Sequence, residues 1–182
     1  MRLFIAIPAP TEIRTKFQPI QTLISECGKI KPVEQENIHL TLKFIGEVGE
    51  EKLKQTITKL SHIENEQGFN ITVSGLGAFP KPSHPKIIWA GTSEGSTDIN
   101  NLHGLIDENL KPLGFKPEKR FHPHYTISRV KFMDNKSRLA DILSEHENTE
   151  FGTYTCEKIQ LIESKLTSKG PIYTVLKEYA LS

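Results

Sequence analysis

The chain has 182 residues, which is enough for one well-buried core but not for two independent domains. Its 23 basic and 22 acidic residues leave a formal net charge of +1, so no global field favours a polyanionic or membrane partner. Cys27 and Cys156 do not form a Cys-x-x-Cys pair, which argues against a disulfide framework or a zinc ribbon. No apolar run approaches the ~18 residues of a membrane span. We therefore expect a soluble protein of the cytoplasm that does not contact a membrane.

The first half of the chain predicts alternating strands and helices. We expect strands over 2–8, 37–46, 69–73 and 86–91, with helices over 11–28 and 51–60. The helices follow from apolar residues at three- and four-residue spacing, and the strands from alternation or β-branched runs. The segment 75–85 is rich in glycine and proline, so we expect a loop there.

The second half repeats this scheme. Apolar spacing predicts a strong helix over 99–113, closed by Gly114, and a short helix over 139–143. Strands are expected over 124–131, 152–163 and 171–179. Irregular alternation with hairpin-like neighbours favours an α+β fold with antiparallel sheets. We expect one domain over residues 1–182, a monomer built of two similar lobes.

Two segments, 37–44 and 123–129, each contain the pattern His-x-Thr-x inside a strand. Alternate side chains of a strand point the same way, so each strand presents an imidazole and a hydroxyl on one face. One copy would carry little information, because His and Thr are ordinary strand residues. Two copies 85 residues apart indicate a symmetric site across a cleft, in which His39 and His124 exchange protons in opposite directions.

Strict alternation assigns the other residues of the two motif strands to faces. In the first strand it places Lys43 beside His39 and Thr41, which makes Lys43 a candidate cation for the site. In the second strand it places Arg129 opposite to His124. A guanidinium fork nevertheless suits a phosphate, and a bulge would bring it back to the imidazole face. Alternation and chemistry therefore disagree about Arg129.

A metal site is the first alternative. His122 and His124 form a His-x-His pair, and His39 would complete three ligands. Pro123 indicates that the regular ladder begins only at about 124, so His122 need not share the face of His124. No carboxylate accompanies either motif, and a hydroxyl two residues on is a poor zinc ligand. We therefore expect neither a metal nor another cofactor.

The segments HLTLKFIG (39–46) and RFHPHYTISR (120–129) resemble the paired signatures of the two-histidine (2H) phosphoesterases. Within that superfamily they are similar to the RNA 2′,3′-cyclic phosphodiesterases, also called 2′-5′ RNA ligases. The opening strand 3–7 and the late segments 164–166 and 170–173 resemble the same branch, so the likeness runs from end to end.

The resemblance implies a bilobal fold and metal-independent hydrolysis of an RNA terminal 2′,3′-cyclic phosphate to a 2′-phosphate. It implies that His39 is the proton donor and His124 the proton acceptor. It also implies that Thr41, Thr126 and Arg129 bind the phosphate. Histidine suits both roles because its unperturbed pKa of about 6.5 allows opposite protonation states near neutrality.

Two alternatives remain at this stage besides the metal site. The first is a module that binds RNA ends without useful turnover. The second is a 2H enzyme for another substrate, such as ADP-ribose 1″,2″-cyclic phosphate or a 2′-5′ oligonucleotide, including reversible 2′-5′ ligation. RNA ends stack on aromatic rings, and the candidates for that contact are Phe79, Trp89, Tyr125 and Tyr173. A locally basic stretch that attracts a polyanion comprises Lys111, Lys116, Lys119, Arg120, Arg129 and Lys131.

Overall fold

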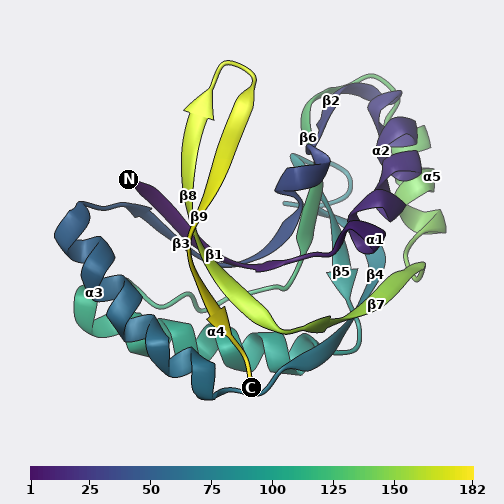
Figure 1. The fold of residues 1–182 in the computed structure, drawn as a ribbon. Helices are drawn as coiled ribbons and strands as arrows, with labels where there is room; N and C mark the ends of the chain where they lie inside the picture. The colour runs from purple at the N-terminus through teal and green to yellow at the C-terminus, as the bar shows by residue number, and fades with distance from the viewer.

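A computed structural model describes all residues, 1–182 (Figure 1). The strands are β1 (Arg2–Pro8), β2 (Gly28–Pro32), β3 (His39–Glu47), β4 (Phe69–Phe79), β5 (Ile87–Thr92), β6 (Tyr125–Met133), β7 (Glu150–Cys156), β8 (Lys158–Thr167) and β9 (Gly170–Ala180). The α-helices are α1 (Thr11–Arg14), α2 (Gln18–Ser25), α3 (Glu50–Leu60), α4 (Ser96–Leu110) and α5 (Lys136–Glu145). Short 3₁₀ turns extend several of these helices.

All nine strands belong to one antiparallel sheet. Its order is β7-β4-β5-β6-β3-β1-β8-β9, and β2 pairs with β6 beside this path. The two motif strands, β3 and β6, are paired through Leu40 and Tyr125 alone. This single pair joins two lobes, so the motif strands are neighbours in the sheet.

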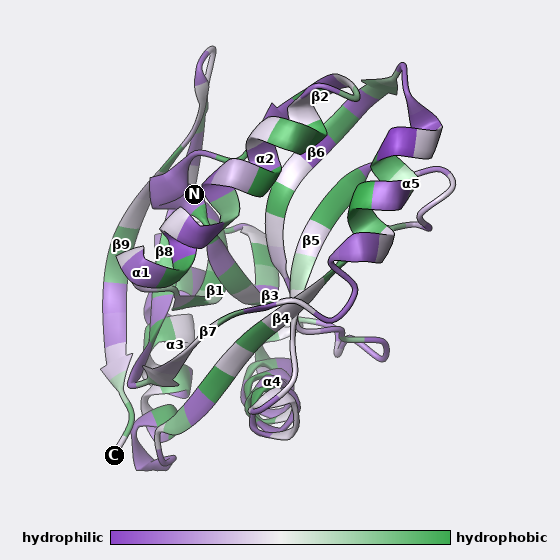
Figure 2. Cartoon of the chain, turned by 90° about the vertical axis from the view of Figure 1, so that its right-hand side faces the viewer, coloured by the Kyte–Doolittle hydropathy of each residue, from purple (hydrophilic) through white to green (hydrophobic).

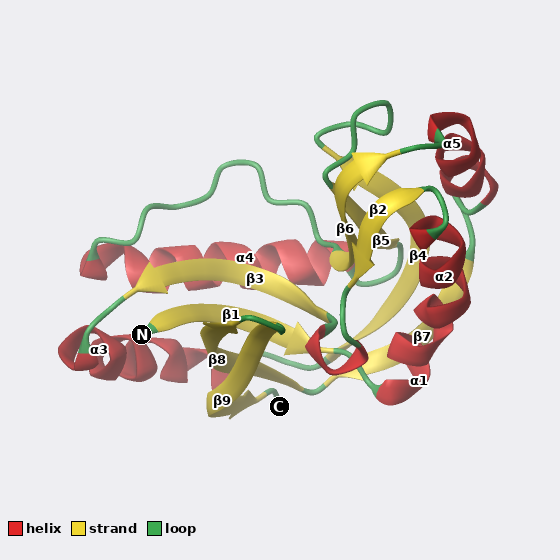
Figure 3. Ribbon diagram, turned by 90° about the horizontal axis from the view of Figure 1, so that it is seen from above, coloured by secondary structure: helices red, strands yellow, loops and turns green.

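The two lobes do not correspond to the two halves of the chain. One lobe contains β1, β3, β8 and β9 with α3 and α4, and the other contains β2 and β4–β7 with α1, α2 and α5 (Figures 1 and 3). The C-terminal β8 pairs with the N-terminal β1, from Arg2–Ser164 to Ala6–Gln160. The halves are thus intertwined, and the hairpin of β8 and β9 stands across from β2 and β6 (Figure 1).

The helices cover the sheet with apolar faces. On α4 the buried apolar residues Ile99, Leu102, Ile106 and Leu110 recur every three or four positions. On the other lobe α2, which carries both hydrophobic and hydrophilic residues (Figure 2), buries Ile20 and Ile24. All of these residues belong to one buried cluster of 35 residues that runs through both lobes. The core therefore fixes the two lobes relative to each other.

The predicted helices and most predicted strands are confirmed, and three differences follow from local geometry. Strand β2 was not expected from its short polar sequence. Strand β4 runs on through the expected loop to Phe79, because Gly75 (φ +79°) forms a bulge at which the ladder with β5 shifts by one residue. The expected strand 152–163 is two strands, interrupted at Glu157. No helix is long and apolar enough to cross a membrane.

Candidate active site

A cleft of about 590 Å³ lies where the two motif strands meet. His39, Thr41, His124, Thr126 and Arg129 all line it, together with residues of β2 and of the β8–β9 hairpin. The residues selected from the two sequence motifs therefore converge on one cavity. Their chemical roles in it remain predictions.

Each motif histidine is oriented by the same backbone hydrogen bond. His39 Nδ1 lies 2.7 Å from the carbonyl oxygen of Asn37, and His124 Nδ1 lies 2.6 Å from that of His122. A carbonyl only accepts, so Nδ1 carries a proton in both rings. In the neutral ring Nε2 is then unprotonated, and at His39 it accepts a 3.0 Å hydrogen bond from the Thr41 hydroxyl. Both imidazoles are set to take up or release a proton at Nε2.

Aromatic rings pack against both imidazoles. Phe4 stacks on His39 at 4.9 Å between ring centroids, and Tyr173 meets the same ring edge-on at 5.4 Å. Phe79 meets His124 edge-on at 5.0 Å, with Trp89 at 6.3 Å. These contacts fix the ring planes and exclude water from one side of each ring.

This apolar packing favours the neutral form of both histidines. Burial lowers the pKa of His39 to about 4; the Asn37 carbonyl opposes the shift, while the positive charges of Arg129 and His124 add to it. Burial likewise lowers the pKa of His124, against the effect of the His122 carbonyl. A bound anion would act in the opposite direction, because it stabilises an imidazolium. Binding of an anion near the two rings would therefore favour uptake of a proton by one of them.

A β-bulge follows the threonine in each motif strand. In β3, Thr41 pairs with Ala6 and Lys43 with Ile5, so Leu42 has no partner on β1. In β6, the ladder with β5 shifts by one residue between Thr126 and Ser128. Each extra residue reverses the alternation beyond it. In β3, Leu42 and Lys43 are consequently both buried and Phe44 faces the cleft. In β6, Ile127 and Ser128 are both buried and Arg129 faces the cleft.

The bulges change the faces that strict alternation assigned to Arg129 and Lys43. Arg129 returns to the face of His124 and lines the cleft, so the opposite face predicted by strict alternation is wrong. Lys43 moves to the other side and is buried, so its placement beside His39 and Thr41 is also wrong. Strict alternation would put Phe44 on the face away from His39, but Phe44 lines the cleft and is 72% exposed.

A buried polar side chain from a helix supports each bulge. His103 of α4 donates from Nδ1 to the Leu42 carbonyl at 2.7 Å. Gln21 of α2 donates from Nε2 to the Ile127 carbonyl at 2.8 Å. Both carbonyls belong to the extra residue of a bulge, and that of Ile127 also accepts the backbone N–H of Val33 at 2.9 Å. The helices thereby fix the bulges that aim Phe44 and Arg129.

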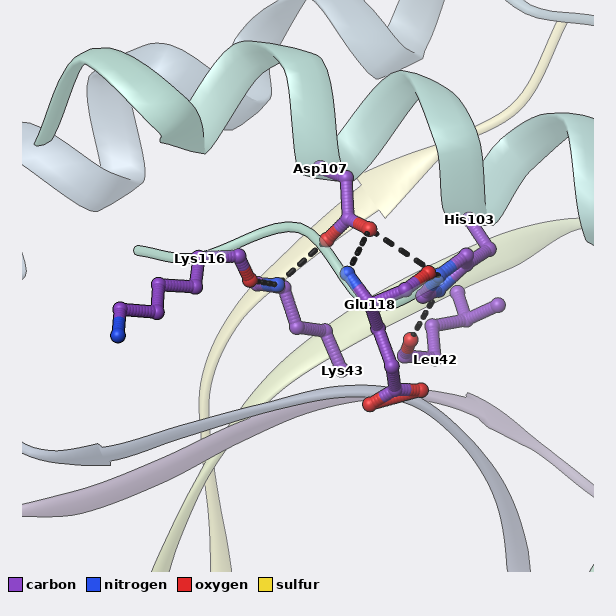
Figure 4. A network of polar contacts seen from close by, with 6 residues as sticks. All are labelled: Leu42, Lys43, His103, Asp107, Lys116 and Glu118. Carbon is purple, nitrogen blue, oxygen red and sulfur yellow. Dashed lines mark hydrogen bonds and ion pairs between the residues drawn. The ribbon is translucent and has the colours of Figure 1, made fainter. Parts of the chain in front are cut away.

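Lys43 belongs to a buried hydrogen-bond network between β3 and α4 (Figure 4). Its ammonium donates to Asp107 Oδ1 and, at 2.9 Å, to the carbonyl of Lys116. Asp107 Oδ2 accepts the backbone N–H of Glu118 at 2.8 Å and lies 3.2 Å from His103 Nε2. A buried cation is thus neutralised by a carboxylate that is itself fully hydrogen-bonded.

This network anchors the loop that leads into the second motif. Lys116 and Glu118 lie in that loop, and Phe121 stacks on His103 with 3.9 Å between centroids and 7° between planes. Three residues later the chain reaches His124. The first motif strand and the approach to the second are therefore joined through α4.

Several other predicted contacts are not part of the cleft. Tyr125 is fully buried, and its hydroxyl bonds that of Tyr154 at 2.6 Å, so its ring is not available to an RNA base. Trp89 and Phe79 pack on His122 and His124, whereas Tyr173 lines the cleft. No three histidine, cysteine or acidic side chains, the His122, His124 and His39 set included, converge in a geometry that could hold a metal ion.

Sequence reasoning missed most of the cations in the cleft. Arg2, Lys31 and Lys169 line it beside Arg129, and Glu34 is its only acidic residue. Of the predicted basic stretch, only Arg129 is among the lining residues. The missed lysines come from the unexpected strand β2 and from the tip of the β8–β9 hairpin, and no motif marks either of them.

The chain matches the family model described as LigT like Phosphoesterase twice, over residues 7–89 and 91–173. The chain belongs to this family. Each match contains one His-x-Thr-x motif, which agrees with the equivalent geometry of the two histidines. An RNA 2′,3′-cyclic phosphodiesterase of Methanocaldococcus jannaschii is 41% identical to the chain, over 98% of this chain and 100% of the relative. The Escherichia coli protein of the same name is 30% identical, over 100% and 97%.

Solved structures of LigT-like proteins have the same fold. A Thermus thermophilus protein, TT0787, superimposes with a TM-score of 0.85 at 28% identity, covering 100% of this chain and 98% of the other. Escherichia coli LigT complexed with 3′-AMP superimposes with a TM-score of 0.79 at 27% identity, with the same coverage. The α+β fold predicted from the sequence is confirmed by these relatives.

Proposed function

We propose that this LigT-like phosphoesterase hydrolyses the 2′,3′-cyclic phosphate at the end of an RNA strand to a 2′-phosphate, without a metal. The observation that carries the proposal is the convergence of His39, His124 and Arg129 on one cleft, with both imidazoles anchored through Nδ1. The names of full-length relatives support the choice of substrate. An RNA-binding module would need cations more than two imidazoles held for proton exchange.

Both histidines act in the reaction step. His124 Nε2 takes a proton from water, whose oxygen attacks the phosphorus. The bond between phosphorus and the ribose 3′ oxygen breaks, and His39 gives that oxygen the proton from its Nε2. The products are a 2′-phosphate and a 3′-hydroxyl, and the two histidines have exchanged protonation states. His39 is charged at the start because the anionic phosphate in the cleft offsets the burial that lowers its pKa in the free protein.

Thr41, Thr126 and Arg129 bind the phosphate. The hydroxyls bond its non-bridging oxygens, and the guanidinium offers two parallel N–H groups to the charge that develops on them. Thr41 already bonds His39 Nε2 in the free protein, so its hydroxyl also holds the ring toward the substrate. Arg129 has an exposed side chain at the cleft wall, where it can reach the anion without a buried carboxylate competing for it.

Incubation of a short RNA ending in a 2′,3′-cyclic phosphate with the protein and excess EDTA tests the proposal. The expected product is a terminal 2′-phosphate, identified by chromatography against both phosphate isomers. Binding without turnover would favour the RNA-end module. Turnover only after metal addition would favour the metal alternative. Hydrolysis confined to ADP-ribose 1″,2″-cyclic phosphate or a 2′-5′ linkage would assign another 2H substrate.

We further propose that the protein works as a monomer in the cytoplasm. The two histidines, the two threonines and Arg129 all line one cleft of a single chain, so the proposed reaction needs no residue from a second copy. Cys27 and Cys156 are both buried and unpaired, which suits a reducing compartment. Sedimentation at catalytic concentrations checks the first point.

A further inference from the structure

We propose a binding track for the RNA strand that precedes the terminal nucleotide, formed by Lys31, Lys29 and Phe132 on β2 and β6. The inference rests on the proposed function and extends it: the preferred substrate is the end of a single-stranded RNA, not a cyclic mononucleotide. The lysines contact backbone phosphates, and the base of an upstream nucleotide stacks on Phe132.

The register between β2 and β6 places these residues in a line with the catalytic cleft. Lys31 pairs with Arg129, and the next pair outward on the same face is Lys29 with Phe132. Between them, Ile30 pairs with Val130, and both of these side chains pack toward the core. The register shifts between Lys29 and Ile30, which makes Lys131 an extra residue of β6; Lys29 therefore pairs with Phe132 on the side opposite to the core-facing pair. The track therefore begins at the phosphate-binding arginine.

The spacing fits an extended strand of RNA. Lys31 and Lys29 are two residues apart on β2, which corresponds to about 6–7 Å along the strand. One nucleotide step of an unstacked chain therefore brings successive phosphates past successive lysines. β2 pairs with no other strand than β6, so the track lies at an open edge where a chain can leave the cleft.

Phe132 has the character of a stacking platform. Phe132 is 61% exposed although it is a large apolar residue, and it directly follows a β-bulge at which Lys131 has no partner on β2. A flanking ammonium and an exposed ring together match single-stranded nucleic acid, which offers a phosphate and a base face at each step. Charge complementarity commits the occupant to a polyanion, because the lysines of the track have no carboxylate partner.

The opposite wall of the cleft extends this surface. Lys169 and Leu166 at the hairpin of β8 and β9 line the cleft, and the Lys31 ammonium lies against Gly170, 3.6 Å from the position of an added Cβ. The Lys31 side chain therefore reaches from β2 to the hairpin tip, and a strand leaving the cleft follows β2 past this contact toward Lys29. Glu34 is the one carboxylate on the cleft wall and is the nearest source of repulsion.

Paired substrates test the track. kcat/KM is measured for a 2′,3′-cyclic mononucleotide and for a four-nucleotide RNA with the same cyclic end, with wild type, Lys29→Ala, Phe132→Ala and Phe132→Tyr. We expect Phe132→Ala to lower the value for the tetranucleotide by about 5- to 100-fold, because stacking of one base carries that much binding. The mononucleotide does not reach the track, so its kcat/KM should stay within about twofold. Phe132→Tyr keeps the ring and should retain the preference.

The salt dependence of kcat/KM isolates the phosphate contact of Lys29. The plot of log kcat/KM for the tetranucleotide against log salt should lose about 0.7 of its slope in Lys29→Ala, the amount for one phosphate contact on a single strand. Lys59→Ala removes an equally exposed lysine of α3, away from the cleft, and should leave both substrates unchanged.

The results separate two failures. If wild type cleaves neither substrate, the proposed function is wrong. A second outcome is that wild type cleaves both substrates while Lys29→Ala and Phe132→Ala leave the ratio of kcat/KM for the tetranucleotide to that for the mononucleotide unchanged. In that case the track is wrong and the proposed function stands.

Discussion

The two motif strands share one backbone design. In each, the histidine donates from Nδ1 to the carbonyl two residues earlier, and a bulge follows the threonine. A polar side chain from a helix bonds the carbonyl of the extra residue, His103 in one strand and Gln21 in the other. The fold thus supplies two equivalent imidazoles to one cleft.

The strands differ in the residues that the bulges redirect. The cleft position after the bulge is Phe44 in β3 and Arg129 in β6. The buried position before it is Lys43, paired with Asp107, in one strand, and Ser128, whose hydroxyl has no hydrogen-bond partner, in the other. The symmetric backbone therefore provides two proton carriers, and the neighbouring side chains make their surroundings unequal.

The largest effects are expected at the histidines themselves. His39→Ala and His124→Ala should each lower kcat for the cyclic phosphate by about 10²- to 10⁴-fold, with the fold intact, because an acid and a base are both needed. The double variant should not multiply the deficits, since the pair works as a unit. Near-normal turnover in either single variant would refute the two-histidine assignment.

A substrate with an easy leaving group separates the two roles. The departure of p-nitrophenolate from a 2′-deoxynucleoside 3′-(p-nitrophenyl phosphate) needs little protonation. His39→Ala should therefore lose much less activity on this ester than on the cyclic phosphate, whereas His124→Ala should lose a similar factor on both. The reverse pattern would exchange the donor and the acceptor.

The next largest effect on activity is expected from substitutions of Arg129. Arg129→Met should lower kcat/KM by about 10²- to 10³-fold, because it removes the fixed cation at the developing charge. Arg129→Lys keeps the charge but not the fork, and a loss of about 10- to 100-fold is expected. Phe44→Leu changes the equivalent position of the other strand and should cost much less. Equal losses at both positions would mean that the strands are not functionally unequal.

Among these variants, loss of the buried ion pair between Lys43 and Asp107 should have the largest effect on the free energy of unfolding. Asp107→Ala leaves the Lys43 ammonium buried without its carboxylate, and should lower the free energy of unfolding by about 3–5 kcal/mol. Replacing both residues, as Lys43→Met with Asp107→Leu, should restore part of that loss. Denaturant unfolding of the three proteins gives the coupling. A single-variant loss below about 1 kcal/mol would show that the pair does not hold the loop.

The pH dependence gives a smaller, directional effect. Burial lowers the pKa of both histidines in the free protein, so the state with one proton on the pair is populated at lower pH than usual. The bell-shaped profile of kcat/KM should therefore peak below the ordinary histidine pKa of about 6.5. Arg129→Met removes a positive neighbour and should move the profile to higher pH. A monotonic rise to pH 9 would contradict proton exchange by this pair.

The features that were predicted correctly from the sequence are those that short sequence patterns encode. The α+β class followed from element order, and the histidines and threonines of the cleft followed from two repeated motifs. Arg129 and Lys43 could not be placed by alternation, because one inserted residue reverses every face beyond it and leaves no mark in composition. Strand β2 is only five residues long and mostly polar, so its pairing with β6, and with it Lys31, was not foreseen.

The intertwining of the two lobes could not be predicted from the sequence either. The pairing of β8 with β1 joins residues about 160 positions apart, and no local pattern encodes so distant a partner. The network of Asp107 has the same origin, since it combines a strand, a helix and a loop that only the tertiary fold brings together. Local sequence therefore identified the reacting groups but not the elements that aim them.

The central claim is that two equivalently anchored imidazoles take opposite protonation states around one phosphate, and ¹⁵N NMR of the histidine rings tests it most directly. At pH 7 the free protein should show His39 and His124 as neutral rings protonated at Nδ1. Saturation with a nucleoside 2′-phosphate should convert one of them to the imidazolium and leave the other neutral. Two rings that stay neutral with ligand bound, or that carry their proton on Nε2 in the free protein, would contradict the account.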